Sequence, residues 1–307
     1  MREMEPGIPR LRELNRLLRE LLDERVGCPI DELCEQPDYV EACFEALMEE
    51  EAACGSLLAE VRLGGIWVLR PHFLDCFRRA ERRVRWRHAL FHAEPIIAWA
   101  LDPPDMMDTV VRYTCELAPD GIAGVDLYPE YRRFGYAAIY RMAERAAEAG
   151  LGVTCHDGEF EPDTLGQALD IPGLTRLGHA TQAYRVPGLL DELARRGIVV
   201  EVALTSNVVL GAVESFEAHP LRRFLDAGVR VTLCSDDPVT FATNIGREYA
   251  LAARLGFSEE ELLRMARTGI EASFTAAKNK ETLLAALEPG GRTISEPRRG
   301  SALRNSR

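Results

Sequence analysis

The feature that most constrains the fold of this 307-residue chain is a repeated alternation of short apolar segments with amphipathic ones. From residue 57 onward, each apolar segment is rich in branched residues, and a helical pattern of apolar positions separates it from the next. Parallel strands joined by crossover helices produce this kind of repeat. The predicted strands span residues 57–64, 86–94, 121–130, 151–159, 174–181, 199–207 and 229–237.

Seven strand–helix units predict an α/β fold, a TIM-type (β/α)8 barrel with its first strand missing. The residues before 57 contain a leucine-patterned helical segment at 9–25 and a second helical segment at 39–54, but no credible strand. A barrel missing one strand would be open between the strands at 57–64 and 229–237, and both edges would carry unpaired backbone groups.

The end of the chain has a different character. Residues 257–287 are predicted to form closing helices, with Ser258 and Glu261 as a capping box. The segment 289–307 is rich in Gly, Pro, Ser and Arg, which predicts a disordered tail. We therefore expect one barrel domain over residues 1–288.

Charge and composition exclude several classes of function. The net charge of −12 and a pI near 5.1 argue against nucleic acid as a partner, because an acidic surface repels phosphate backbones. The chain has no apolar run near 18 residues, and no basic-then-apolar segment at its start, so a membrane span and a secretion signal are not predicted. The eight cysteines form no CxxC pair. These features predict a cytoplasmic protein with reduced thiols.

Polar side chains gather where the predicted strands end. They are His156 and Glu159, then His179, then Asn207, and finally Asp236 with Asp237. In a parallel barrel the active site lies at the carboxyl ends of the strands, so these residues predict one shared site. No GxGxxG, GxxxxGK[ST] or GxSxG motif points to a different chemistry.

Four segments resemble the motifs of the adenosine deaminase family. TCHDGE (154–159) resembles T-x-H-A-G-E, and RLGHAT (176–181) resembles R-[IL]-G-H-G. The segment 204–241 is similar to the family's T-S-N…HP…S-D-D-P block, and GVDLYPE (124–130) resembles G-[IV]-D-L-A-G-D-E. The motifs occur in the family's order and together cover about residues 57–285.

The resemblance implies hydrolytic deamination of a 6-aminopurine, with adenosine to inosine as the expected reaction, and one Zn²⁺ as cofactor. His156 and Asp236 would be metal ligands, and Glu159 would protonate a purine ring nitrogen. His179 would orient and help to deprotonate the metal-bound water, while Asp237 would hydrogen-bond the purine or the attacking hydroxide. Zinc lowers the pKa of its bound water to about 7, which supplies hydroxide at neutral pH.

The chain departs from the family pattern at three places. It contains no H-x-H, the segment that supplies two metal ligands in the family, so zinc binding is expected to be weak or absent. Either the chain starts late or it is a decayed relative. Pro129 stands near the position where the family's backbone N–H contacts the purine, and proline has no such donor. Asp157 replaces an alanine and could contact the substrate or point away from the site.

Two alternatives therefore stay open. One is a deaminase of adenine or of another adenine-bearing metabolite. The other is a catalytically inactive barrel that binds a purine or a protein partner. A small-molecule purine is the expected ligand in the enzyme interpretations, and the sequence does not predict an oligomeric state. His219, which precedes Pro220, is interpreted as a packing residue, and His88 and His92 as structural residues on one strand.

Overall fold

The computed structural model describes residues 30–99, 104–129 and 134–288, together with Glu13, Arg16, Leu17 and Glu20. The predicted tail at 289–307 and most of the predicted helix at 9–25 lie outside the described residues.

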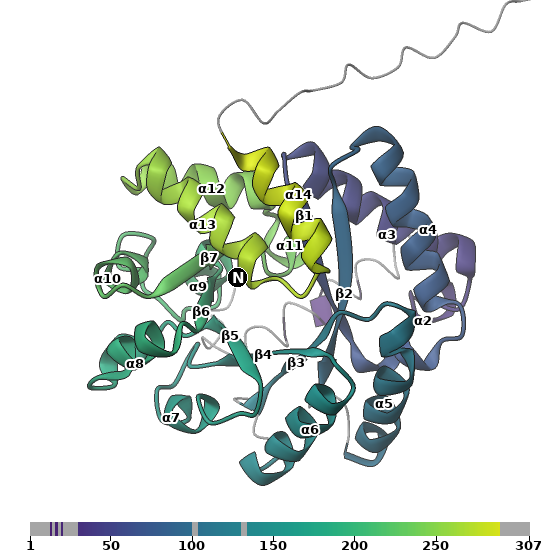
Figure 1. Cartoon of the computed structure of the whole chain (residues 1–307), viewed down its shortest axis with the longest axis horizontal. Coiled ribbons are helices and arrows are strands. Elements are labelled where there is room, and N and C mark those ends of the chain that lie inside the picture. Colours follow the sequence, from purple (N-terminus) through teal and green to yellow (C-terminus); the bar gives the residue numbers. More distant parts are fainter. Residues whose placement is uncertain are drawn as a thin grey trace, which may run out of the picture.

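The described strands form one parallel sheet in which sequence order and spatial order coincide (Figure 1). This arrangement confirms the predicted α/β fold, a TIM-type barrel that is missing a strand. The strands are β1 (Leu58–Gly64), β2 (His92–Trp99), β3 (Gly124–Leu127), β4 (Gly152–Asp157), β5 (Leu174–His179), β6 (Val199–Val202) and β7 (Arg230–Leu233).

Helices connect the strands and lie around the outside of the sheet (Figure 1). The α-helices before β5 are α2 (Ile30–Leu33), α3 (Pro37–Ala53), α4 (Phe73–Arg87), α5 (Pro104–Leu117), α6 (Tyr136–Glu148) and α7 (Leu165–Ala168). Those that follow are α8 (Leu189–Arg196), α9 (Leu204–Val209), α10 (Leu221–Asp226), α11 (Pro238–Phe241), α12 (Ile245–Arg254), α13 (Glu259–Ala272) and α14 (Ala277–Leu287). Short 3₁₀ segments occur at η1 (Gly65–Leu69), η2 (Ala118–Asp120) and η4 (Ala183–Arg185).

The described sheet is open between β1 and β7, as the sequence predicts. Helix α3 borders this opening and contacts the segment after β7, where the Ser235 hydroxyl donates a hydrogen bond to Glu51 Oε1 over 3.3 Å. Met48 of α3 is fully buried beside the opening and lines its cavity. Helix α3 is thus hydrogen-bonded to the segment that follows β7.

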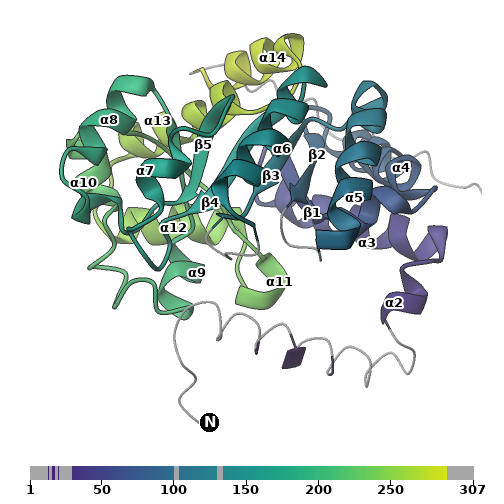
Figure 2. The ribbon, with the colours of Figure 1, turned by 90° about the horizontal axis from the view of Figure 1, so that it is seen from below.

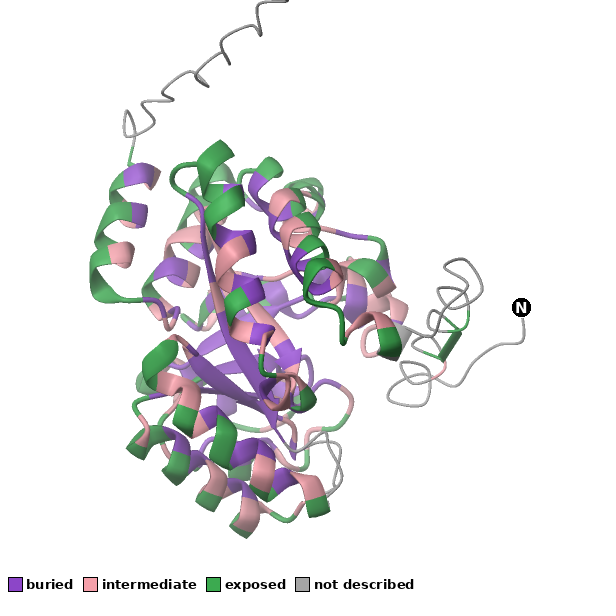
Figure 3. Cartoon of the chain, turned by 90° about the vertical axis from the view of Figure 1, so that its right-hand side faces the viewer, coloured by how far each residue is buried: buried purple, intermediate pink, exposed green. Residues whose placement is uncertain are grey.

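The core lies between the sheet and the inward faces of the helices. Figure 3 shows most of the strand residues as buried and the helices as buried on one face and exposed on the other; β1, at the edge of the sheet, is mostly half-buried. The arginine-rich helix α4 places its polar face against α3, where Arg79, Arg83 and Arg87 pair with Glu41, Glu45 and Glu49. These ion pairs join the two neighbouring helices.

A single aromatic ring fills the amino-terminal end of the sheet. The Phe274 ring packs against Gly124 of β3 and Gly152 of β4, where an added Cβ would lie 2.3 and 2.1 Å from ring carbons. The Arg176 guanidinium stacks on the ring at 3.8 Å, and the Phe274 backbone N–H donates to Glu60 of β1. The absence of side chains at the two glycines therefore creates the space that Phe274 occupies.

Two predicted strands are wrong in their boundaries. The segment 86–94 is not a strand, because α4 continues to Arg87 and the strand begins only at His92. His88 is the C-cap of α4, so His88 and His92 do not share a strand. The predicted strand 199–207 ends at Val202, and Asn207 lies on the short helix α9. The predicted Ser258–Glu261 capping box is confirmed.

Every helix that the structure describes is too short or too polar to cross a membrane.

Candidate functional site

All but Asn207 of the six polar residues predicted from the strand ends line one cavity of about 970 Å³. His156, Glu159, His179, Asp236 and Asp237 all contribute to its wall. Figure 2 shows α9 and α11, which follow β6 and β7, at this end of the barrel and α14 at the opposite end. Part of the cavity therefore lies where the strands end, and the predicted convergence of these side chains is observed.

His156 is held by contacts on three sides. Its Nδ1 lies 2.9 Å from Oδ2 and 3.0 Å from Oδ1 of Asp126, a fully buried carboxylate on β3. Tyr128 stacks on its ring at 4.3 Å. Gly178 of β5 lies against the other side, where a Cβ would be 3.2 Å from ring atoms. Because the carboxylate accepts, Nδ1 carries the proton and Nε2 is the nitrogen that can act as a ligand.

His156 and Asp126 each favour the charged form of the other. Burial alone would raise the pKa of Asp126, but His156 and Arg62 outweigh it and lower this pKa to about 2. Burial would lower the pKa of His156, whereas the Asp126 carboxylate raises it above its ordinary value. Asp126 is therefore an anion within the barrel and fixes the orientation of the imidazole beside it.

Glu159 and His179 share one hydrogen-bond donor. The Asn207 Nδ2 atom lies 2.9 Å from Glu159 Oε1 and 2.9 Å from His179 Nδ1. The His179 ring meets the His156 ring edge-on at 4.8 Å. Burial, followed by the nearby His156, lowers the pKa of His179 to about 4. His179 is therefore neutral at physiological pH.

Two of the site residues have a strained backbone. His179 has φ = 64° and Asp236 has φ = 55°, the left-handed region that residues with a side chain seldom adopt. Such conformations cost about 1–3 kcal/mol and are retained where the surroundings enforce them. Both occur where β5 and β7 turn into the cavity wall, which is consistent with a functional constraint on these turns.

The two aspartates after β7 differ in their contacts. Asp237 is the N-cap of α11, with Oδ1 accepting from the Thr240 backbone N–H at 3.0 Å and Oδ2 from the Thr240 hydroxyl at 2.6 Å. Asp236 contributes to the electrostatic field at His156 and His179. Both line the cavity, but Asp237 has a capping role in addition to its predicted contact with a ligand.

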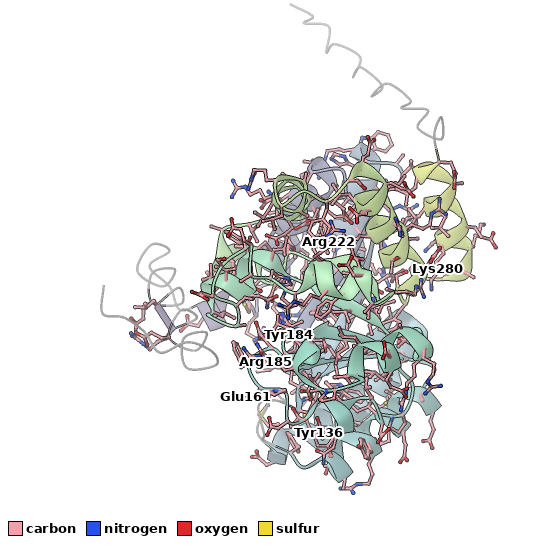
Figure 4. The ribbon with its side chains drawn as sticks, turned by 90° about the vertical axis from the view of Figure 1, so that its left-hand side faces the viewer. Tyr136, Glu161, Tyr184, Arg185, Arg222 and Lys280 are labelled. Carbon is pink, nitrogen blue, oxygen red and sulfur yellow. The ribbon has the colours of Figure 1, made fainter. Side chains whose placement is uncertain are left out.

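Asp157 points away from the cavity, which is the second of the two orientations that the sequence left open. Alternation along β4 turns its side chain away from the cavity, so that Oδ2 accepts from Tyr136 at 2.6 Å and Oδ1 from Thr164 at 2.6 Å. Asp157 is fully buried there, and Tyr136 belongs to the side of the molecule shown in Figure 4. Pro129 is buried after Tyr128 and does not line the cavity either, so the geometry gives it no direct substrate contact.

The sequence did not predict a network of buried charges in the wall of the cavity. Arg62 of β1 pairs with both Asp126 and Glu201, and Arg176 of β5 pairs with Glu201 and Glu60. The available signal was a single carboxylate within an otherwise apolar strand, as in GVDL (124–127) and VVEV (199–202). Buried carboxylates of this kind are retained when an arginine compensates their charge.

The described residues do not complete a metal site. Within residues 30–99, 104–129 and 134–288, no three His, Cys, Asp or Glu side chains converge in an arrangement that would hold a metal ion. A catalytic zinc ion takes three protein ligands and a water molecule. His156 has the carboxylate partner typical of a metal-binding histidine, but with Asp236 it provides only part of a ligand set.

The fold and the cavity define a parallel α/β barrel with polar residues gathered at its strand ends, and comparison with known proteins identifies its family. The adenosine deaminase family model matches residues 71–289, more than half of the chain. The chain belongs to the adenosine deaminase family.

Among individual relatives, the similarity is to adenine deaminases. The chain is 38% identical to the adenine deaminase of Agrobacterium fabrum over 186 residues, which are 60% of this chain and 57% of that protein. It is 40% identical to the adenine deaminase of Rhizobium leguminosarum over 186 residues, 60% of this chain and 58% of that protein. The aligned part thus spans less than two thirds of the length of these relatives.

Solved structures show the same fold. Adenine deaminase from Arthrobacter aurescens superposes with a TM-score of 0.75 at 23% identity, covering 88% of this chain and 93% of that one. The N6-mAMP deaminase of Arabidopsis gives a TM-score of 0.72 at 21% identity, covering 92% and 94%. A zinc-bound amidohydrolase from Burkholderia ambifaria gives 0.73 at 22%, covering 83% and 73%.

Proposed function

We propose that this protein is a hydrolytic deaminase of a 6-aminopurine, and that adenine is its substrate rather than adenosine. Water would add to the amino-bearing carbon of adenine and ammonia would leave, giving hypoxanthine. The relatives that are 38–40% identical over 184–186 residues are adenine deaminases. This similarity favours the free base as substrate over the nucleoside expected from the family name.

The observation that carries the proposal is the pairing of Glu159 with His179 through Asn207 in one cavity. Addition to an aromatic carbon requires a proton on the neighbouring ring nitrogen, and a carboxyl group next to the substrate can supply it. Glu159 has this role in the proposal, and the neutral His179 beside it orients the attacking oxygen. Both groups are buried, at 7% and 3% exposure, so water competes weakly with these contacts.

A second candidate function is a barrel that binds a purine without turning it over. The incomplete set of metal ligands among the described residues favours it. It differs from the first proposal in one measurable respect, because it predicts adenine binding without ammonia release.

Purified protein should be assayed with adenine and adenosine, with and without added zinc, by following ammonia and the deaminated product. We expect turnover of adenine at a higher kcat/KM than adenosine. Replacement Glu159→Gln should lower kcat by about 10²–10⁴-fold, because the amide cannot donate a carboxyl proton, and it should change KM little. The exposed Glu161, labelled in Figure 4, gives the matched control Glu161→Gln, which should retain activity.

Two outcomes would contradict the enzyme proposal. One is adenine binding by calorimetry with no ammonia release under any of these conditions, which supports the binding barrel. The other is equal activity of the Glu159→Gln and wild-type proteins. Preference for adenosine over adenine would overturn the choice of substrate alone.

A further inference from the structure

A chain of hydrogen bonds runs from the start of α10 to the cavity. The Leu221 backbone N–H donates to His219 Nδ1 at 3.1 Å, and His219 Nε2 lies 3.2 Å from Asn207 Oδ1. Asn207 Nδ2 then contacts both His179 and Glu159. His219 and Asn207 are buried, at 7% and 0% exposure, and neither belongs to the lining of the cavity.

The direction of every bond in this chain is fixed by its two ends. A backbone N–H can only donate, so His219 Nδ1 must be an unprotonated acceptor, and the proton of neutral His219 lies on Nε2. At the other end, the Glu159 carboxylate accepts, so the Asn207 amide must present its NH₂ group to Glu159 and its carbonyl to His219. Both requirements give the same direction for the contact between the two residues: His219 Nε2–H donates to Asn207 Oδ1.

The same amide group determines the state of His179. With one N–H of Asn207 on Glu159 Oε1, the other points at His179 Nδ1, which must therefore accept. A neutral imidazole carries one proton, and it must lie on the other ring nitrogen, Nε2.

We propose that Asn207 and His219 are positioning residues that hold His179 in the tautomer protonated on Nε2. This inference rests on the proposed function in one respect: the His179 Nε2–H then donates a hydrogen bond to the oxygen that attacks the purine. It revises the role implied by the family resemblance, because a neutral imidazole in this tautomer donates at Nε2 and cannot take a proton there.

The tautomer can be read directly by ¹⁵N nuclear magnetic resonance of protein labelled at its histidine side chains. Couplings to the ring protons separate the protonated from the unprotonated nitrogen, and the His179 signals are identified by their loss in His179→Gln. In the wild-type protein we expect the proton of His179 on Nε2. In Asn207→Asp, a carboxylate faces Nδ1 and accepts from it, so we expect the proton to move to Nδ1.

Two further variants separate positioning from simple packing. His219→Gln retains an amide N–H that can donate to Asn207 Oδ1, so it should keep the wild-type tautomer. Asn279→Asp makes the same chemical change on α14, where Asn279 donates to Thr275, and should leave the His179 signals unchanged. In activity assays we expect kcat to fall about 10–100-fold in Asn207→Asp and less in His219→Gln.

The inference is overturned if wild-type His179 is protonated on Nδ1, or if Asn207→Asp folds and keeps the wild-type tautomer. If Asn207→Asp does not fold, as judged by circular dichroism, His219→Phe takes its place. That variant removes the donor to Asn207, and it should increase the population protonated on Nδ1; an unchanged population would contradict the inference. The tautomer is measured without turnover, so failure of the proposed function would leave this test intact.

Discussion

Asn207 gives Glu159 and His179 a common donor, and it does so from a helix whose sequence contains no charged residue. The states of both groups therefore depend on a residue that does not line the cavity. Behind it, His219 is neutral, because burial, followed by the nearby His179, lowers its pKa to about 3. A histidine interpreted from sequence as packing thus has a defined place in the hydrogen bonding of the site.

The low pKa of His219 makes the stability of the fold depend on pH in a predictable direction. The unfolded chain binds a proton at His219 near pH 6.5, whereas the folded protein does not until about pH 3. Below pH 6.5 the unfolded state therefore gains protons that the folded state lacks, and stability falls as the pH falls, by at most about 1.4 kcal/mol per pH unit. His219→Gln removes this contribution.

Urea unfolding at pH 7, 6, 5 and 4.5 measures this effect. We expect the wild-type protein to lose more stability over this range than His219→Gln does. His88→Gln is a control at a half-buried surface histidine and should follow the wild type. Parallel curves for the wild type and His219→Gln would show that His219 takes up its proton equally in both states.

The site residues with a strong local signal could be predicted from the sequence. His156, Glu159, His179 and Asp236 end their strands or follow them closely, and strand ends in a parallel barrel meet at one mouth. Alternation with His156 indicates that Asp157 points away from the cavity, but its partner Tyr136 could not be predicted, since Tyr136 lies on the separate helix α6. The pairing of Arg62 with Glu201 is equally inaccessible, because 139 residues separate them.

At the scale of elements, the packing of β3, β4 and the segment before α14 depends on two glycines, which have no side chain. Phe274 occupies the space above Gly124 and Gly152, and it contacts Arg176 and Glu60 at the same time. The pattern of strand residues indicated where these strands lie but not why they begin with glycine. The error at β2 has a similar origin, because residues 86–91 are apolar enough for a strand, while the ion pairs of Arg87 extend α4 through that position.

Replacement Gly152→Ala should destabilise the fold by about 1–3 kcal/mol, since its Cβ would lie 2.1 Å from the Phe274 ring and the ring must move. The free energy of unfolding from urea titration measures this loss. Gly166→Ala, on α7, has open space around its Cβ and should be neutral or slightly stabilising. In the double variant Gly152→Ala with Phe274→Ala, the two effects should be less than additive. Full additivity would mean that the two residues do not contact each other.

At the scale of the whole molecule, the opening in the sheet and the incomplete set of metal ligands lie on the same side of the cavity. The opening between β1 and β7 lies next to Asp236, and the described residues around it contribute no third ligand. The strand count and the order of the motifs allowed the open barrel to be predicted, because each strand was followed by its own helix.

Zinc binding tests this arrangement. A site with two protein ligands should bind zinc weakly, so we expect less than about 0.1 zinc per chain after gel filtration, where a site with three ligands would retain close to one. Elemental analysis measures the content, and His156→Gln is the variant that should reduce any residual binding. Stoichiometric zinc in the purified protein would contradict this prediction and show that further ligands complete the site.

The hydrogen bond from the Phe274 backbone to Glu60 joins positions that lie 214 residues apart. During synthesis on the ribosome, Glu60 and the strands around it leave the exit tunnel long before Phe274 is made. Throughout that interval no Phe274 ring covers Glu60 and Arg176, so water has access to these two side chains in the cavity wall. Completion of the interior therefore comes late in the synthesis of this chain, and a nascent chain stalled before residue 274 should remain more open to proteases than the released protein.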